Sequence, residues 1–146
     1  EVQDGTGYGG GVLDLGSGSG ILGIAAIRLG AARAVCADVN PDAIESARRN
    51  GAANGVDGRL DHRLADAAGL AGEGPFDLVV ANVGGELLLD EAPRVAALAR
   101  PGGRLVLSGL LREWAGDLEG AYVRLGCAVL ERRLAGAFCT LLLRRG

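Results

Sequence analysis

Lysine and methionine are absent from this sequence of 146 residues, and aromatic residues make up only 3% of it. All 15 basic side chains are therefore arginines, and 18 acidic side chains outnumber them, for a formal net charge of −3. Proteins that grip nucleic acid irrespective of its sequence depend on an excess of positive charge, which neutralises phosphates. The charge balance therefore speaks against strong nucleic-acid binding.

Metal-ligating residues are also scarce. Cys36, Cys127 and Cys139 are widely spaced, form no Cys-x-x-Cys pair, and have only His62 as a possible nitrogen ligand. Because a zinc site needs several such ligands at close spacing, we predict no metal site. Cys36 and Cys139 lie in apolar runs, which indicates reduced core thiols and a cytoplasmic protein.

Long apolar runs are missing as well. No run in the chain approaches the roughly 20 residues that span a bilayer, and no charged-then-apolar leader opens the sequence. We therefore expect a soluble protein with no membrane partner. The sequence begins with Glu1 instead of Met, so we expect it to be a piece of a longer protein. No sequence pattern indicates an oligomeric state.

The hydrophobic content of 49% is enough for one buried core in a chain of this length. Apolar runs alternate with segments of helical periodicity, which predicts an α/β, Rossmann-like fold with a mostly parallel sheet and helices on both faces. We expect seven strands, at residues 12–15, 34–39, 59–64, 76–83, 104–110, 128–134 and 138–144. The last two are so close in sequence that they form a C-terminal antiparallel hairpin.

Helices are expected between these strands, at residues 21–29, 41 to 50 or 53, 86–99 and 113–125. Gly30 is expected to end the first helix. Asn40 is expected to cap the second helix and Pro41 to begin it. Pro101 and the two glycines after it are expected to end the third. Residues 1–11, rich in glycine, are expected to form a flexible lead-in to one domain at residues 12–146.

A glycine-rich loop follows the first strand, in the sequence Asp-Leu-Gly-Ser-Gly-Ser-Gly at residues 14–20. Glycines let the backbone approach a ligand closely, and ligands of open α/β sheets bind where the strands end. We therefore predict that a nucleotide-like ligand binds here, at Asp14, Gly16, Ser17, Gly18 and Gly20.

The loop also matches the G-x-G-x-x-G pattern of dinucleotide-binding oxidoreductases, at residues 18–23. Two features favour S-adenosyl-L-methionine over a dinucleotide. Asp14 would repel a pyrophosphate, whereas it would attract a sulfonium or an amino group. A dinucleotide domain also has no need of the C-terminal hairpin.

Two further carboxylates follow strands. Asp38 ends the second strand, where its oxygens can accept hydrogen bonds from both ribose hydroxyls of an adenosine, and Val39 beside it joins the predicted cofactor site. Asp66 follows the third strand and is placed to accept from the adenine amino group, while the amide of Ala67 faces a ring nitrogen. The alternative for either acid is an ordinary solvated side chain.

Four longer stretches carry a resemblance to one family. They are VLDLGSGSGILGIAAIRLGA, ADVNPDAIESARRNGAANGV, FDLVVANVGGELLLDEAP and LARPGGRLVLSGLL. Together they resemble the methyltransferase domain of the PrmA family of class I S-adenosylmethionine-dependent methyltransferases, which methylates a ribosomal protein of the large-subunit stalk base. The more diagnostic pieces are residues 81–83 and 108–111. The resemblance implies S-adenosyl-L-methionine as cofactor, protein amino groups as acceptors and a ribosomal protein as partner.

Asn82 is the predicted catalytic residue, and it also belongs to the predicted cofactor site. It lies where the chain leaves the fourth strand beside the glycine loop, and its side-chain carbonyl can there accept a hydrogen bond from an acceptor amine and align the amine with the methyl group. Its alternative role is that of a turn residue that bonds its own backbone.

The sequence departs from the family in two places. The family's Gly-Thr-Gly-Thr-His segment lies about one helix ahead of the first strand, whereas the similar residues 5–8 are separated from Val12 by three glycines. Residues 83–85, Val-Gly-Gly, replace bulkier ones. The family also carries a separate N-terminal substrate-recognition domain, for which this sequence shows no counterpart. Three functions therefore stay open: a protein methyltransferase, a methyltransferase acting on a small molecule or an RNA base, and a cofactor-binding module with little activity because that N-terminal domain is missing.

Three other residues are given ordinary roles. His62 is expected to be a half-exposed strand residue instead of a catalytic base. Trp114 and Tyr122, on one predicted helix, are expected to be packing residues, and Trp114 is also a candidate for lining the acceptor pocket.

Overall fold

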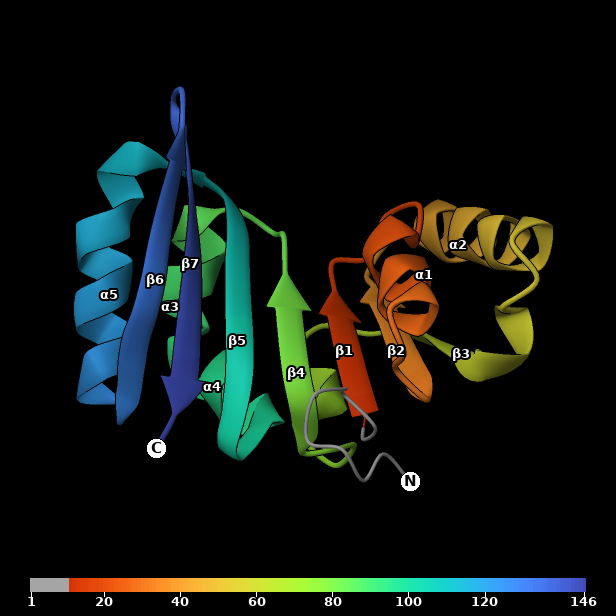
Figure 1. Cartoon of the computed structure of the whole chain (residues 1–146), viewed down its shortest axis with the longest axis horizontal. Helices are drawn as coiled ribbons and strands as arrows, with labels where there is room; N and C mark the ends of the chain where they lie inside the picture. Colours follow the sequence, from red (N-terminus) through yellow and green to blue (C-terminus); the bar gives the residue numbers. More distant parts are fainter. Residues whose placement is uncertain (1–10) are drawn as a thin grey trace.

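The computed structural model describes residues 11–146, in which helices cover both faces of a seven-stranded sheet (Figure 1). The strand order across the sheet is β3-β2-β1-β4-β5-β7-β6. Strand β7 runs antiparallel to both of its neighbours, and the other neighbouring pairs are parallel. This confirms the predicted Rossmann-like sheet and its C-terminal hairpin. The strands are β1 (Gly11–Leu15), β2 (Arg33–Asp38), β3 (Leu60–Leu64), β4 (Phe76–Ala81), β5 (Ala99–Leu111), β6 (Cys127–Ala135) and β7 (Phe138–Arg145).

The helices cover different halves of the sheet on its two faces (Figure 1). Helices α1 (Ile21–Arg28) and α2 (Pro41–Ala53) lie over β1, β2 and β3 on one face, and α3 (Gly85–Asp90), α4 (Ala92–Leu98) and α5 (Ala115–Arg124) lie over β5 and its neighbours on the other. Successive residues of a strand point to opposite faces, so Val12 of β1 joins the core under α1 and Leu13 joins the core under α3 to α5. The central strand is therefore buried on both faces, as the continuous apolar run predicted.

The first two helices begin where the sequence predicted, and α1 ends within one residue of its predicted end. The Asn40 side chain accepts a hydrogen bond from the Asp42 N–H, and Pro41 is the first residue of α2. Gly30, at φ +113, follows the end of α1. Its N–H donates to the Ile27 carbonyl, and the Ala31 N–H donates to the Ala26 carbonyl, which together form a Schellman motif.

The prediction of one continuous helix at residues 86–99 is wrong, because the structure divides this segment into α3 and α4 at Glu91. Pro93 explains the break: it has no N–H to continue the hydrogen bonds of α3, and its ring restricts the residue before it. Both pieces still bury apolar side chains, such as Leu88 and Val95, against the same face of the sheet.

The predicted start of the fifth strand is also wrong. Strand β5 begins at Ala99 instead of Arg104, and Pro101, Gly102 and Gly103 lie within it. Ala99 pairs with Phe76, and the register then shifts before Arg104 pairs with Leu78. Pro101, Gly102 and Gly103, which were predicted to end a helix, therefore lie where the pairing register of β5 with β4 shifts.

The flexible lead-in expected at residues 1–11 lies outside the described residues, except for Gly11, which begins β1 and pairs with Arg33. Each helix found in residues 11–146 is too short or too polar to cross a membrane.

Candidate functional site

A cavity of about 360 Å³ lies at the carboxyl edge of the parallel strands. Residues from the ends of β1 to β4 surround it on one side, and residues from α3 and α4 close the other. It is lined by Leu15, Gly16, Asp38, Val39, Ala65, Asp66, Ala67, Asn82, Val83, Leu87, Glu91 and Val95. Six of the predicted site residues are thus brought together here: Gly16, Asp38, Val39, Asp66, Ala67 and Asn82.

The glycine loop passes tightly over the end of β2. The N–H groups of Gly16 and Ser17 both donate to the Ala37 carbonyl, at 2.8 and 2.9 Å. Gly16 has φ +73, and a Cβ on it would stand 2.1 Å from Val83 Cγ1, so a side chain at this position would collide with the cavity wall. Gly20, also at positive φ, packs against Ala47 of α2. The loop therefore depends on glycine both for its backbone and for its close neighbours.

Asp38 connects this loop to β2. Its Oδ2 accepts a hydrogen bond from the Gly18 N–H and its Oδ1 accepts one from the Asn40 N–H, both at 2.9 Å. Each carboxylate oxygen has a further lone pair, so Asp38 can still accept hydrogen bonds from a ligand in the cavity.

Asp14 lies beneath the loop and does not line the cavity. Its side chain is buried, with Oδ2 accepting a hydrogen bond from the Gly23 N–H in α1 at 2.9 Å. Burial raises its pKa to about 6, the Gly23 N–H partly offsets this effect, and the negative charge of Asp38 adds to it. Within residues 11–146, Asp14 Oδ1 and Ser17 Oγ are buried without a hydrogen-bond partner.

The other predicted residues lie at the end of the cavity beside β3. The Val39 side chain is largely exposed at the cavity, whereas Ala67 is buried. Asp66 Oδ1 accepts a hydrogen bond from the Gly69 N–H at 2.9 Å, which fixes the carboxylate at the start of a 3-10 helix (Ala68–Leu70).

Asn82 stands at the end of β4, between the glycine loop and β5. Its backbone N–H donates to the Leu15 carbonyl at 3.4 Å. Its side-chain Oδ1 lies next to the α-carbon of Gly109 in β5. The predicted catalytic residue is therefore held at the cavity by two neighbouring strands.

The far wall of the cavity was not predicted. Leu87 lies in α3, Val95 in α4 and Glu91 between the two helices, and their place at the site follows from how these helices fold back on the sheet. One feature of the sequence could have indicated this wall: the helical segment that supplies it closely follows Asn82, a predicted site residue.

A second, shallower hollow of about 550 Å³ adjoins the first and shares Val83 and Leu87 with it. Trp114 forms one side, in the 3-10 helix η3 (Arg112–Trp114) instead of the helix that was predicted. Its indole packs so closely on Gly85 that a Cβ there would stand 2.5 Å from Trp114 Cγ. Tyr122 is a buried packing residue, as predicted, and its hydroxyl donates to the Leu88 carbonyl at 3.0 Å.

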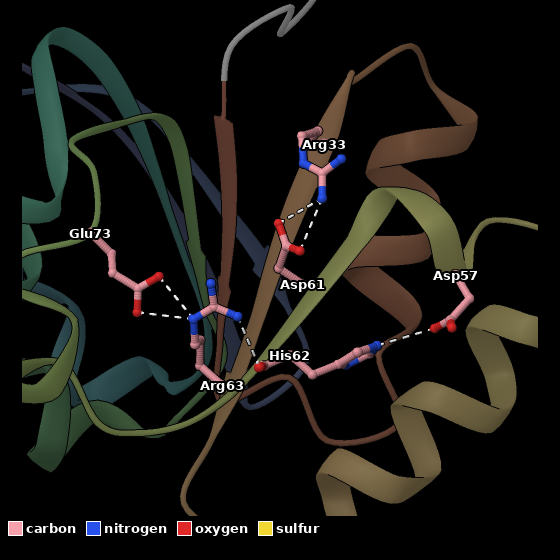
Figure 2. Close-up of polar contacts among 6 residues, drawn as sticks. All are labelled: Arg33, Asp57, Asp61, His62, Arg63 and Glu73. Carbon is pink, nitrogen blue, oxygen red and sulfur yellow. Dashed lines mark hydrogen bonds and ion pairs between the residues drawn. The ribbon is translucent and has the colours of Figure 1, made fainter.

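Polar contacts along β3 lie outside the cavity (Figure 2). Arg33 pairs with Asp61, and Arg63 donates to both carboxylate oxygens of Glu73, at 2.9 and 3.1 Å. His62 is a partly exposed residue of β3, as predicted, although its imidazole ring is only 3% exposed. In the parallel register His62 lies beside Cys36, on the face that α1 and α2 cover, and its Nε2 lies 3.3 Å from Asp57 Oδ1.

Cys36 and Cys139 are buried free thiols, as predicted, and Cys127 is a third. Burial, with a smaller contribution from the charge of Asp14, raises the pKa of Cys36 to about 12. No group of three or more His, Cys, Asp or Glu side chains suited to a metal ion occurs in the part of the chain that the structure describes.

Known proteins share both the sequence and the fold of this chain. The family described as ribosomal protein L11 methyltransferase (PrmA) matches residues 3–146. The ribosomal protein L11 methyltransferase of Azotobacter vinelandii is 49% identical over 76% of this chain and 37% of its own length. That of Geobacter metallireducens is 40% identical over 100% of this chain and 48% of its own length. The chain thus spans about half, or less, of these relatives.

A solved structure agrees with the sequence comparison. The ribosomal protein L11 methylase of Lactobacillus delbrueckii subsp. bulgaricus superimposes with a TM-score of 0.86 and 30% identity, over 94% of this chain and 71% of that one.

Proposed function

Because this chain belongs to the ribosomal protein L11 methyltransferase (PrmA) family, we propose that it binds S-adenosyl-L-methionine in the cavity at the carboxyl edge of the sheet and transfers its methyl group to protein amino groups. We propose residues 12–146 as the domain that does so. The observation that carries the proposal is the convergence of Gly16, Asp38, Asp66 and Asn82, from the ends of four adjacent strands, on one cavity.

The residues present fit this cofactor. Asp38 is placed to accept from the ribose hydroxyls, and Asp66 with Ala67 to hold the adenine, while Val39 and Leu87 offer apolar surface to the base. Asp14 Oδ1 and Ser17 Oγ, at the glycine loop, are buried without a hydrogen-bond partner within residues 11–146. The negative charge of Asp14 suits a cationic amino acid better than a pyrophosphate. These features support S-adenosyl-L-methionine over NAD.

Methyl transfer requires alignment of the two reactants more than it requires a strong base. When bound, S-adenosyl-L-methionine supplies a methyl group on a positively charged sulfur, and the methyl passes to the amine nitrogen as the carbon–sulfur bond breaks. The acceptor has to react as a neutral amine, because an ammonium group has no lone pair. The ammonium form therefore first releases a proton to solvent. Asn82 accepts a hydrogen bond from the amine and directs its lone pair toward the methyl group.

We propose ribosomal protein L11 as the acceptor, since the family and both relatives carry that name. The three free thiols support a cytoplasmic location, where the reducing environment keeps cysteines unpaired.

The direct test is transfer of a labelled methyl group from S-adenosyl-L-methionine to purified ribosomal protein L11 by this chain. We expect label on amino groups of the acceptor, and much less with Asn82→Ala. Binding of S-adenosylhomocysteine without any transfer would instead support the alternative of a cofactor-binding module. Labelling of RNA or of small molecules in place of the protein would refute the proposed acceptor.

A further inference from the structure

Strand β5 contains a bulge beside Asn82. Leu107 pairs with Leu141 and Leu110 pairs with Cys139, so β5 has one residue more than β7 between these pairs. Gly109, within this bulge, has φ +71, a conformation that residues with a side chain rarely adopt. Bulges of this kind change where neighbouring side chains point.

The side chain of Asn82 fills the space that a Cβ on Gly109 would take. Ala81 pairs with Leu107, which places Asn82 next to the bulge. A Cβ on Gly109 would stand 2.0 Å from Asn82 Oδ1 and 3.2 Å from its Cγ. Two non-bonded atoms cannot approach to 2.0 Å, so the observed position of the amide requires glycine at residue 109.

We propose that Gly109 is a positioning residue for methyl transfer: its bare α-carbon keeps the amide of Asn82 where it orients the acceptor amine. This inference rests on the proposed function of Asn82. The backbone of Asn82 is fixed separately through Leu15, so a methyl group at residue 109 displaces only the short side chain. Asp38 belongs to β2, and Asp66 and Ala67 follow β3, so these residues lie on the other side of the sheet's centre from Gly109.

The same strand offers a matched control. Gly102 also lies in β5 and has φ +79, but the nearest atom to a Cβ there is Arg100 Nη1 at 3.8 Å. Alanine at residue 102 therefore carries the same backbone strain without any contact with Asn82. Comparing the two variants separates displacement of the amide from the general cost of alanine at positive φ.

The test measures single-turnover methyl transfer to ribosomal protein L11 for Gly109→Ala, Gly102→Ala, Asn82→Ala and the double variant at residues 82 and 109. We expect Gly109→Ala to lower the maximal rate between about tenfold and a hundredfold, because a misplacement of about 1 Å can cost that much. Its affinity for S-adenosylhomocysteine should equal that of the unaltered chain, and Gly102→Ala should react at the unaltered rate. The double variant should be no slower than Asn82→Ala, which has no amide left to displace.

Equal rates for Gly109→Ala and Gly102→Ala, or a double variant slowed by the product of the two single effects, would overturn the inference alone. An unaltered rate in Asn82→Ala would instead overturn the proposed role of Asn82. A second measurement does not depend on activity: the side-chain amide signal of Asn82 in a ¹H–¹⁵N spectrum should shift in Gly109→Ala and not in Gly102→Ala. An unshifted signal in Gly109→Ala would also overturn the inference.

Discussion

Asp38 holds the glycine loop and lines the cavity with the same carboxylate, since its Oδ2 accepts the hydrogen bond from the Gly18 N–H at 2.9 Å. The Asn40 N–H, bound to the other oxygen, fixes the carboxylate at the start of α2. A ligand that bonds Asp38 therefore meets a side chain that is already oriented, which lowers the entropic cost of binding.

We predict that Asp38→Ala weakens the binding of S-adenosylhomocysteine by about 2 kcal/mol, because two ribose hydroxyls lose a charged acceptor and the loop loses its anchor. Titration calorimetry measures this directly. Asp61→Ala is the matched control: this carboxylate lies on the neighbouring strand β3, pairs with Arg33 on the surface, and does not line the cavity. Equal affinities for the Asp38 and Asp61 variants would place the ribose elsewhere.

Asp14 should make the stability of the protein depend on pH. Its pKa is raised from 3.8 to about 6 in the folded state, so the folded protein holds a proton that the unfolded chain has released between about pH 4 and pH 6. The contribution of neutral Asp14 to the free energy of unfolding is therefore fully present below about pH 4. It is lost as the pH rises through about 6. At pH 7.5 the buried charge costs up to about 3 kcal/mol.

We expect Asp14→Asn to remove this dependence, because asparagine keeps an acceptor for the Gly23 N–H without a titrating group. The variant should be more stable than the unaltered chain at pH 7.5, while the difference shrinks toward pH 4. Its affinity for S-adenosyl-L-methionine should fall, because the cationic ligand loses a nearby negative charge. Urea unfolding at the two pH values checks the first part. A stability difference that is the same at both values would show that Asp14 does not titrate as described.

The sequence predicted most of the fold because its signals are local. Asn40 and Pro41 identify the start of α2, and Gly30 identifies the end of α1, through chemistry that each residue carries by itself. The break at Glu91 was missed although Pro93 is a local signal for it, because the apolar pattern continues across the break. The irregular start of β5 was missed because it depends on pairing with β4.

The residues of the candidate site also differ in whether local sequence signals identify them. Gly16, Asp38, Asp66 and Asn82 were identifiable because ligands of such sheets bind where strands end. Leu87, Glu91 and Val95 could not be identified, because only the folding of α3 and α4 back onto the sheet brings them there. The burial of the His62 ring likewise depends on its neighbours across the sheet.

Gly16→Ala should weaken cofactor binding by narrowing the cavity. The added Cβ would stand 2.1 Å from Val83 Cγ1, so the valine must move, and overpacking of this kind costs about 1–3 kcal/mol. We expect the affinity for S-adenosylhomocysteine to fall about tenfold or more, which corresponds to about 1.4 kcal/mol. Gly55→Ala is the control, because Gly55 has φ +70 and no atom within 4 Å of its Cβ position. Equal affinities in the two variants would contradict the contact with Val83.

The most direct test of the central claim, that this cavity holds S-adenosyl-L-methionine, is thermal unfolding with and without ligand. A ligand that binds only the folded state stabilises it by about 2.7 kcal/mol at a hundredfold excess over Kd. S-adenosylhomocysteine should raise the Tm of the unaltered chain, should raise it much less in Asp38→Ala, and NAD should leave it unchanged. A Tm raised by NAD and not by S-adenosylhomocysteine would contradict the account.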